Sequence, residues 1–565
     1  MAPGGAGGRR FLRCQTTALI PFQSMLSRLT RDHKIFFVVA LLALALAGMA
    51  ALWRSTPYGL GLVNDTAYYV EGAANLLAGK GFVRLSGGGE LKPITHFPPL
   101  FSLALAGFGL AGLPLLAGAR LLITLLFGLD ILLVGLSIYK ISRSALFALF
   151  GALLLAISDV HLGVYSFALS EPLFLTLMLA VFLSLTQSFA RREWYWAVLT
   201  GLLLSLAYLT RYAGASLFIT LLLTVVLLQL PAQRQRKEAR RLSRSPFKEI
   251  ILTLAGAFLP ILVWNLYNLT TSQTGALSNR QIAWHPVSFE VLFEALKNLL
   301  TWAAPNEILS RFPSVGRLLS LLSLTLLPGL LAWLASIIRR YDRNSAERIT
   351  NGRLALAFAL ALHILVYLGF LVISLSFFDA ATPLNDRLLS VIYLPEMILF
   401  ACGLAWLWER LSGRAAILRL GLGLFCALFL LFSVRDGLAA VQQLSAQGQG
   451  FAHQGWGESR TLQAIRDLPE IILYSNKPTA IYLLTGKSAY IIPTPTDSVT
   501  GLPRRAYAAD RELIQQRVQQ GQAVLVLFGL KGSDEPDEVA LFNDLSAELP
   551  VLADYGDGVI FGVSP

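Results

Sequence analysis

Long apolar segments separated by short polar ones dominate this chain up to about residue 433. A helix of about 20 apolar residues spans the hydrocarbon core of a bilayer, so these runs predict a polytopic bundle of about eleven transmembrane helices. The runs are approximately 35–53, 119–139, 145–158, 168–188, 194–210, 213–230, 250–268, 317–337, 354–376, 388–408 and 415–433. A further apolar stretch, 98–117, begins with two prolines, which cannot continue a preceding helix.

The pattern changes from about residue 451, where helix-like and strand-like pieces alternate. Predicted helices cover 458–468, 478–485 and 508–519, and predicted strands cover 470–474, 489–492, 523–528 and 558–563. We therefore expect a mainly α membrane bundle followed by a small α/β domain. The predicted divisions are a basic amino terminus (1–34), a transmembrane domain (35–433) with a first outer loop (54–118), and the α/β domain (434–565).

Composition supports this class: 55% of the residues are hydrophobic and only 14% are charged, and the mean hydropathy is +0.61. The net charge of +12 does not indicate nucleic-acid binding, because the basic residues cluster in short loops between apolar runs. That distribution is typical of the cytoplasmic side of a membrane protein. The chain has three cysteines, Cys14, Cys402 and Cys426, and these indicate no disulfide framework.

The basic clusters also predict the orientation of the chain. With a cytoplasmic amino terminus, the clusters share one side only if 98–117 does not cross the membrane. The sequence therefore favours a re-entrant or interfacial segment at 98–117 and places residues 434–565 outside the cell membrane. The clusters are Lys140 and Arg143; Arg191 and Arg192; 234–248; 339–348; and Arg410, Arg414 and Arg419.

Residues of mixed charge gather at the opposite, outer ends of the runs, and Asp65 is the first of them. An ionisable group at the edge of a bilayer is a candidate for function. Its carboxylate could cap a helix that starts at Thr66, or it could act as a general base toward an attacking hydroxyl. The others are Glu71, Lys92, His96, Asp159, His161, Glu171, Arg211, Asp379, Asp386 and Arg387.

Several short motifs follow one another in a fixed order. The first outer loop contains Asn64-Asp65-Thr66-Ala67-Tyr68-Tyr69, then the residues 76–82 (LLAGKGF) and 96–100 (HFPPL). Residues 169–174 (LSEPLF) and 209–212 (LTRY) follow in later segments. Together they resemble the GT-C superfamily of membrane glycosyltransferases, in particular the branch of protein O-mannosyltransferases and lipid A aminoarabinose transferases of bacterial type. The resemblance covers roughly residues 35–400.

This resemblance implies a transferase whose donor is a sugar on a polyprenyl phosphate, acting with inversion on the non-cytoplasmic face. Asp65 matches the acidic residue that serves the family as the catalytic base. Lys92 and His96 lie where family members carry basic groups near the lipid phosphate, although interfacial snorkelling is an alternative for both. Arg211 and Arg387 are further candidates for the donor phosphate, since guanidinium binds phosphate in bidentate fashion. For Arg387 the alternative is an ion pair with Asp386 or Asp379.

Four other residues are candidates for substrate binding or accessory roles: Tyr68, Asp159, His161 and Glu171. A carboxylate in the first turn of a helix is favourable whatever its function, so Glu171 also has a purely structural interpretation. The sequence assigns no cofactor; Asp159, His161 and Glu171 leave a divalent cation open, although their spacing is not that of a compact metal site.

We expect the partners to be a polyprenyl-phosphate-linked sugar and a hydroxyl of a cell-envelope glycan, lipid or protein, and the location to be the cell inner membrane. The alternative function is a transporter or flippase of a lipid-linked or small polar substrate. That class favours charged or broken helices near the bilayer midplane and repeated sets of spans. Here Asp130 and His363 are the main mid-span ionisable residues, and no repeat is visible.

Overall fold

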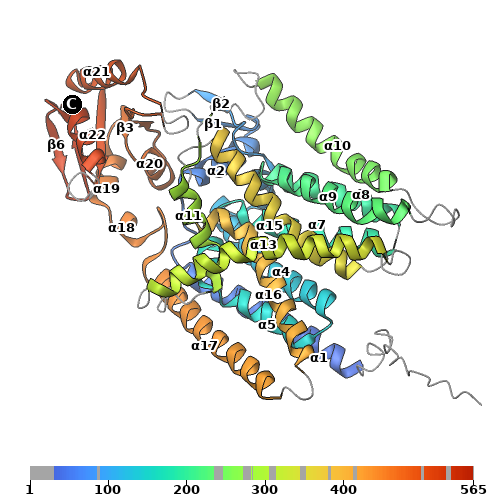
Figure 1. Cartoon of the computed structure of the whole chain (residues 1–565). Coiled ribbons are helices and arrows are strands. Elements are labelled where there is room, and N and C mark those ends of the chain that lie inside the picture. Colours follow the sequence, from blue (N-terminus) through green and yellow to red (C-terminus); the bar gives the residue numbers. More distant parts are fainter. Residues whose placement is uncertain are drawn as a thin grey trace, which may run out of the picture.

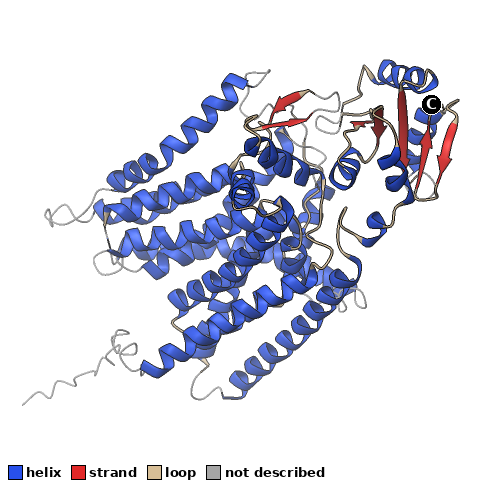
Figure 2. Ribbon diagram, turned by 180° about the vertical axis from the view of Figure 1, so that it is seen from behind, coloured by secondary structure: helices blue, strands red, loops and turns tan. Residues whose placement is uncertain are grey.

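The fold is described from a computed structural model, and it is mainly helical (Figure 1). The structure describes residues 31–85, 90–191, 193–234, 246–271, 282, 284, 286–303, 313–343, 352–378, 383–411, 416–497, 502–529 and 536–563. Long helices form one body, and the larger sheet lies in a smaller body at one end of it (Figure 2).

Within the described residues, eight helices are long and apolar enough to cross a membrane. The pair α5 (Ala145–Ala156) and α6 (Asp159–Tyr165), bent by 56°, adds a ninth candidate, and α8 (Trp194–Thr210) and α9 (Gly214–Arg234) are also apolar. The eight are α1 (Arg31–Ser55), α4 (Leu115–Ser142), α7 (Glu171–Arg191), α10 (Pro246–Thr271), α13 (Pro313–Arg343), α15 (Gly352–Phe377), α16 (Asp386–Arg410) and α17 (Ala416–Gln447). Each predicted run thus coincides with a helix, and the predicted fold class is confirmed.

The stretch 98–117 forms a short helix followed by a turn. Helix α3 (Leu100–Leu110) has 11 residues, and Gly112 then adopts a φ of +84° before α4 begins. At 1.5 Å per residue this helix is about 16 Å long, roughly half of the hydrocarbon thickness. Its length agrees with the interpretation in which this stretch does not cross the membrane.

The helices differ in how much of their surface faces other protein. Phe127 of α4, Phe174 of α7 and Phe358 of α15 are fully buried in the central cluster. By contrast, 0% of the residues in the most apolar stretch of α17 and 17% of those in the most apolar stretch of α10 are buried, as expected for helices that face lipid. Helices α8 and α10 approach closely at two glycines: a Cβ on Gly201 would lie 1.9 Å from the Thr253 carbonyl oxygen, and one on Gly256 would lie 2.3 Å from that of Val198.

The first outer loop folds into a compact unit at one end of the bundle. It contains α2 (Asn64–Leu77) and a small antiparallel hairpin of β1 (Val83–Leu85) and β2 (Leu91–Pro93). The Asn75 amide donates a 2.8 Å hydrogen bond to the carbonyl of Val83, which fastens the hairpin to α2. Two further short elements, α11 (Phe289–Asn298) and the 3₁₀ helix η3 (Thr301–Ala303), precede α13.

The carboxy-terminal domain is built on a five-stranded sheet of order β4-β3-β5-β7-β6. Strand β3 runs parallel to β4 and β5, whereas β7 is antiparallel to β5 and β6. Apolar clusters cover both faces of the sheet. The elements are α18 (Gln454–Gly457), α19 (Arg460–Asp467), β3 (Ile472–Ser475), α20 (Pro478–Thr485), β4 (Tyr490–Ile491), α21 (Tyr507–Gln519), β5 (Ala523–Phe528), α22 (Pro536–Ser546), β6 (Val551–Asp554) and β7 (Gly558–Phe561).

This domain lies at the end of the bundle that carries the first outer loop, with α20 near α2 (Figure 1). The backbone N–H of Phe451 donates a 2.8 Å hydrogen bond to the carbonyl of Leu62, three residues before Asp65. The Ser166 hydroxyl also donates a hydrogen bond to the Gln449 side chain. The segment that enters the domain is therefore joined directly to the segment that precedes α2.

Candidate active site

Asp65 lies in the first turn of α2, but it does not cap the helix. The N-cap position is Val63, whose backbone N–H donates a 3.1 Å hydrogen bond to the Thr66 hydroxyl. The Thr66 hydroxyl in turn donates to the carbonyl of Ala168 at 3.1 Å. The helix-cap interpretation of Asp65 is therefore wrong, and its side chain, 26% exposed, is available for other contacts.

The partner of Asp65 is Arg387, at the start of α16. Asn385 caps this helix through its side chain, which accepts a hydrogen bond from the N–H of Leu388. The Arg387 guanidinium donates through Nη2 to Asp65 Oδ2 and through Nε to Glu171 Oε1. One guanidinium thus connects two carboxylates that belong to different helices.

Glu171 is the buried centre of this cluster. It is the first residue of α7, and only 1% of its side chain is exposed. Its Oε1 lies 2.6 Å from Nη1 of Arg211, the residue that follows α8. Helices α2, α7, α8 and α16 therefore meet at one network of two acids and two arginines.

Two hydroxyl groups extend the network into the bundle. Nη1 of Arg211 lies 3.4 Å from the Ser170 hydroxyl, which lies 2.9 Å from the hydroxyl of Tyr69. Tyr69 is buried, and this burial raises the pKa of its hydroxyl well above the usual value. Tyr69 therefore stays neutral at physiological pH.

The two formal positive charges of the cluster match its two formal negative charges. Burial by itself lowers the pKa of Arg211, the Glu171 carboxylate raises it, and the net shift is upward. Exposure increases from Glu171, at 1%, to Arg211, at 17%, and Arg387, at 30%. The network is thus anchored in the protein at Glu171 and opens outward at Asp65 and Arg387.

The geometry leaves hydrogen-bonding capacity on both arginines. A guanidinium has five N–H donors in a planar fork. Arg211 reaches Glu171 and Ser170 through Nη1 alone, and Arg387 reaches its two carboxylates through Nη2 and Nε. Nη2 of Arg211 and Nη1 of Arg387 take no part in these contacts, so the cluster can accept an additional anionic group.

Tyr212, next to Arg211, holds the first outer loop against the bundle. Its hydroxyl donates to the carbonyl of Thr95 at 2.7 Å. It accepts from Trp264 Nε1 and Asn268 Nδ2 of α10, both at 3.2 Å. These three hydrogen bonds of the Tyr212 hydroxyl fix the segment around His96 relative to α10 and to the neighbouring Arg211.

Comparisons with known proteins agree with this architecture. The sequence model of the dolichyl-phosphate-mannose-protein mannosyltransferase family matches residues 109–272. The apo structure of ArnT from Cupriavidus metallidurans is 16% identical and covers 94% of this chain and 98% of its own, with a TM-score of 0.51. Residues 109–272 thus match this family's sequence model, and the chain as a whole shares the GT-C fold of ArnT.

Two further solved structures are similar. A structure of the same ArnT bound to undecaprenyl phosphate is 14% identical and covers 93% of this chain and 97% of its own, with a TM-score of 0.48. An oligosaccharyltransferase from Archaeoglobus fulgidus, tethered to an acceptor peptide, is 13% identical and covers 88% of this chain and 69% of its own, with a TM-score of 0.51. No curated protein sequence matches the chain.

The other candidates from the first outer loop have packing contacts of their own. Lys92 is exposed on β2, where it pairs in register with Arg84. The ring of His96 packs edge-on against Phe97, with centroids 4.8 Å apart. Tyr68 also packs against Phe97, and the Arg84 guanidinium lies 4.5 Å above its ring. Their roles toward a donor remain predictions.

Asp159 and His161 belong to α6 and do not form a metal site with Glu171 in this structure. His161 is fully buried, and its Nδ1 lies 2.9 Å from the hydroxyl of Ser158. Glu171 is instead in contact with the two arginines. Within the described residues there is no group of three His, Cys, Asp or Glu side chains that could hold a metal ion.

For Arg387, the observed carboxylate contacts are with Asp65 and Glu171, both of which lie far from it in the sequence. Asp386 accepts a 2.9 Å hydrogen bond from the Tyr393 hydroxyl, and Asp379 lies outside the described residues. Sequence reasoning missed Tyr69 and Ser170. Tyr69 lies in the motif at 64–69, next to Tyr68, and Ser170 lies in the motif at 169–174, next to Glu171. Their places in these motifs are what could have identified them from the sequence.

Proposed function

We propose that the protein transfers a sugar from a polyprenyl-phosphate carrier to a hydroxyl group, with inversion at the anomeric carbon. The family whose sequence model matches residues 109–272 is defined by a donor of this type, dolichyl-phosphate-mannose. A donor with a long lipid tail also suits a site at the outer ends of apolar helices. The tail can stay in the bilayer while the headgroup reaches the ionic cluster.

Asp65 acts as the general base in this proposal. The acceptor hydroxyl gives its proton to Asp65, and its oxygen bonds to the anomeric carbon. The bond from that carbon to the phosphate oxygen breaks, and its electron pair leaves on the lipid phosphate. A phosphate whose charge is offset by cations needs no protein acid at the bridging oxygen, so one base suffices for a single displacement.

Arg211 and Arg387 bind the donor phosphate. The N–H groups outside the contacts described above provide the donors, and Glu171 holds both guanidinium groups in place from the buried side. Lys92 and His96 supply additional hydrogen-bond donors to the phosphate from the first outer loop. The phosphate shares Arg387 with Asp65, and Oδ1 of the carboxylate, which lies outside that contact, takes the proton.

We place the reaction on the outer face of the cell inner membrane, with the carboxy-terminal domain outside. The acceptor is a hydroxyl on a cell-envelope glycan, lipid or protein. The observation that carries the proposal is the partly exposed Asp65 carboxylate, held by an arginine that is itself anchored on a buried glutamate. Such a carboxylate has a fixed position and one oxygen, Oδ1, outside the contact with Arg387.

Transfer from radiolabelled polyprenyl-phospho-sugars tests the proposal, with membrane extracts as the acceptor source. The wild type should transfer at least one sugar. Asp65→Asn should lose about 10²- to 10⁴-fold in turnover, the usual contribution of a general base, while donor binding is retained. The matched control is Asp467→Asn, at an exposed position that ends α19 in the carboxy-terminal domain. Normal turnover by Asp65→Asn would refute the role of Asp65, and no transfer by the wild type would favour a transporter.

A further inference from the structure

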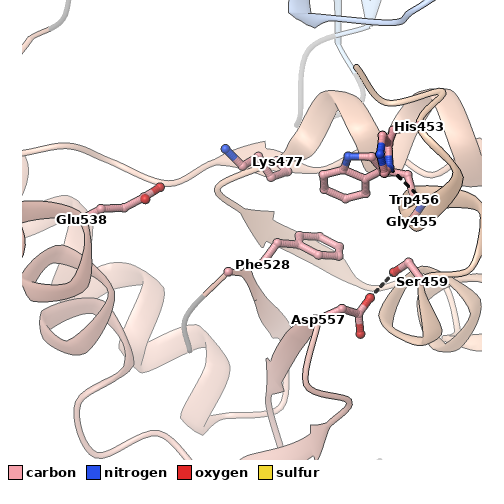
Figure 3. Close-up of a pocket in the computed structure, with 9 residues that line it drawn as sticks. His453, Gly455, Trp456, Ser459, Lys477, Phe528, Glu538 and Asp557 are labelled. Carbon is pink, nitrogen blue, oxygen red and sulfur yellow. Dashed lines mark hydrogen bonds between the residues drawn. The ribbon is translucent and has the colours of Figure 1, made fainter. Parts of the chain in front are cut away.

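A pocket of about 360 Å³ lies in the carboxy-terminal domain (Figure 3). Its lining includes the aromatic side chains of Trp456 and Phe528 and the polar side chains of Lys477, Glu538 and Asp557. This volume is within the range of small-molecule binding sites. None of these residues belongs to the ionic cluster around Glu171.

The pocket lies where the topology of the sheet changes direction. From β3 the chain passes through α20 to β4, which lies on one side of β3 in the sheet. Strand β5 lies on the other side of β3, and β7 and β6 extend the sheet beyond β5. Lys477 follows the carboxyl end of β3, and Phe528 ends β5. In open α/β sheets, ligands bind outside the carboxyl ends of parallel strands at such a switch point.

The two strand ends are locked to each other. The Asn476 side chain donates to the carbonyl of Phe528 at 2.8 Å and accepts from its N–H at 3.0 Å. Asp557 accepts hydrogen bonds from Ser459 and, at 2.8 Å, from Thr461. The base of the pocket is therefore preformed.

The aromatic wall is also fixed. The rings of Trp456 and Phe528 have centroids 5.2 Å apart and an interplanar angle of 58°. Phe451 also packs edge-on against Trp456, with ring centroids 5.3 Å apart. Phe528 is buried, whereas Trp456 is only half-buried and exposes part of its indole to the pocket.

Polar side chains, including those of Lys477 and Glu538, also line the pocket. Figure 3 shows Lys477 between Trp456 and Glu538. The lining thus offers an indole ring, an ammonium donor and, across the pocket from the indole, a carboxylate acceptor. Two carboxylates, on Glu538 and Asp557, disfavour a phosphate or a nucleotide, and the polar lining disfavours a lipid chain.

We propose that this pocket binds an uncharged pyranose unit of a saccharide. The apolar C–H face of the ring would pack on Trp456, and its hydroxyl groups would bond to Lys477 and Glu538. The proposal does not rest on the function proposed for Asp65, because it concerns binding in a separate domain. The pocket is nevertheless connected to the segment that carries Asp65. Phe451 packs on Trp456, and its backbone N–H donates a hydrogen bond to the carbonyl of Leu62, just before α2.

Saturation-transfer NMR on the full-length protein in lipid nanodiscs tests this assignment, since sugar-based detergents would occupy the pocket. The probes are the methyl glycosides of mannose, glucose and N-acetylglucosamine, with inorganic phosphate as a competitor. We expect signal on the pyranose C–H groups of at least one glycoside. Trp456→Leu should raise the Kd for that glycoside about tenfold. Glu538→Gln should also raise the Kd, while Trp456 and Phe528 stay packed as in the wild type.

Trp406→Leu is the matched control, because Trp406 is exposed on α16 in the membrane domain. Asp65→Asn should bind the glycoside as the wild type does, which separates this proposal from the transferase chemistry. The proposal is overturned if no glycoside binds, if Trp456→Leu and Glu538→Gln both bind as the wild type does, or if phosphate displaces the glycoside from these residues.

Discussion

Arg387 donates a hydrogen bond to Asp65 across 322 residues of chain. The contact joins the first turn of α16 to the first turn of α2, and the same guanidinium reaches Glu171 at the start of α7. The position of the candidate base is therefore set by three separate helices. A helix start is a rigid support, so the carboxylate has little freedom to move away from the donor.

Arg387→Lys should weaken donor binding although the charge is kept. A lysine ammonium is a point charge and cannot contact Asp65 and Glu171 in the planar geometry of the guanidinium. Hydrogen bonds to charged groups contribute about 1.5–3 kcal/mol, so we expect the Kd for a polyprenyl phosphate to rise about tenfold or more. Binding to the protein in nanodiscs measures this, with Arg410→Lys at the opposite end of α16 as the control. Equal affinities of Arg387→Lys and the wild type would contradict the phosphate role.

Glu171→Gln should destabilise the whole cluster. The substitution removes the negative charge that two arginines share in a buried position, and loss of one partner of a buried ion pair costs about 3–5 kcal/mol. We expect a lower Tm together with reduced transfer. Thermal unfolding measures the first effect, and Glu193→Gln, at an exposed position before α8, is the control. An unchanged Tm would mean that Glu171 does not anchor the arginines.

Tyr212→Phe should loosen the first outer loop without removing a charged group. The substitution leaves the donors of Trp264 and Asn268 and the carbonyl of Thr95 without this partner, at a cost of about 1–3 kcal/mol for each buried group. We expect the KM for the donor to rise more than kcat falls, since the cluster itself stays intact. Tyr208→Phe is the control, because among the described residues that hydroxyl makes a single long hydrogen bond, 3.4 Å to Asn265. If kcat alone fell, Tyr212 would act in the chemical step instead.

The short helix α3 predicts that the residues before and after it lie on the same side of the membrane. In a variant without the three native cysteines, single cysteines at Lys80 and Leu113 should react with an impermeant thiol reagent from the same side. A cysteine at Glu193, in the loop between α7 and α8, should react from the other side. Labelling of position 113 together with position 193 would show that 98–117 crosses the membrane.

Much of the fold could be predicted because a transmembrane run is a local property of the sequence. The apolar runs, the helix 478–485 and the strand 523–528 all coincide with observed elements. In the carboxy-terminal domain the predictions omitted α18, β6 and α22, which are short or partly polar. The candidate site was partly predictable for the same reason: charged residues at the ends of apolar runs are visible in the sequence, and Asp65, Glu171, Arg211 and Arg387 are all such residues.

The sequence by itself determined which residues are available at the outer ends of the helices, because hydrophobic length sets where each helix stops. Only the tertiary structure decided which of them meet. Residues 68 and 69 differ by about 100° around α2, and the position of α2 relative to the start of α7 places Tyr69, not Tyr68, beside Ser170. The choice of Glu171 as the shared partner of two arginines likewise follows from the positions of α7, α8 and α16, which no local pattern encodes.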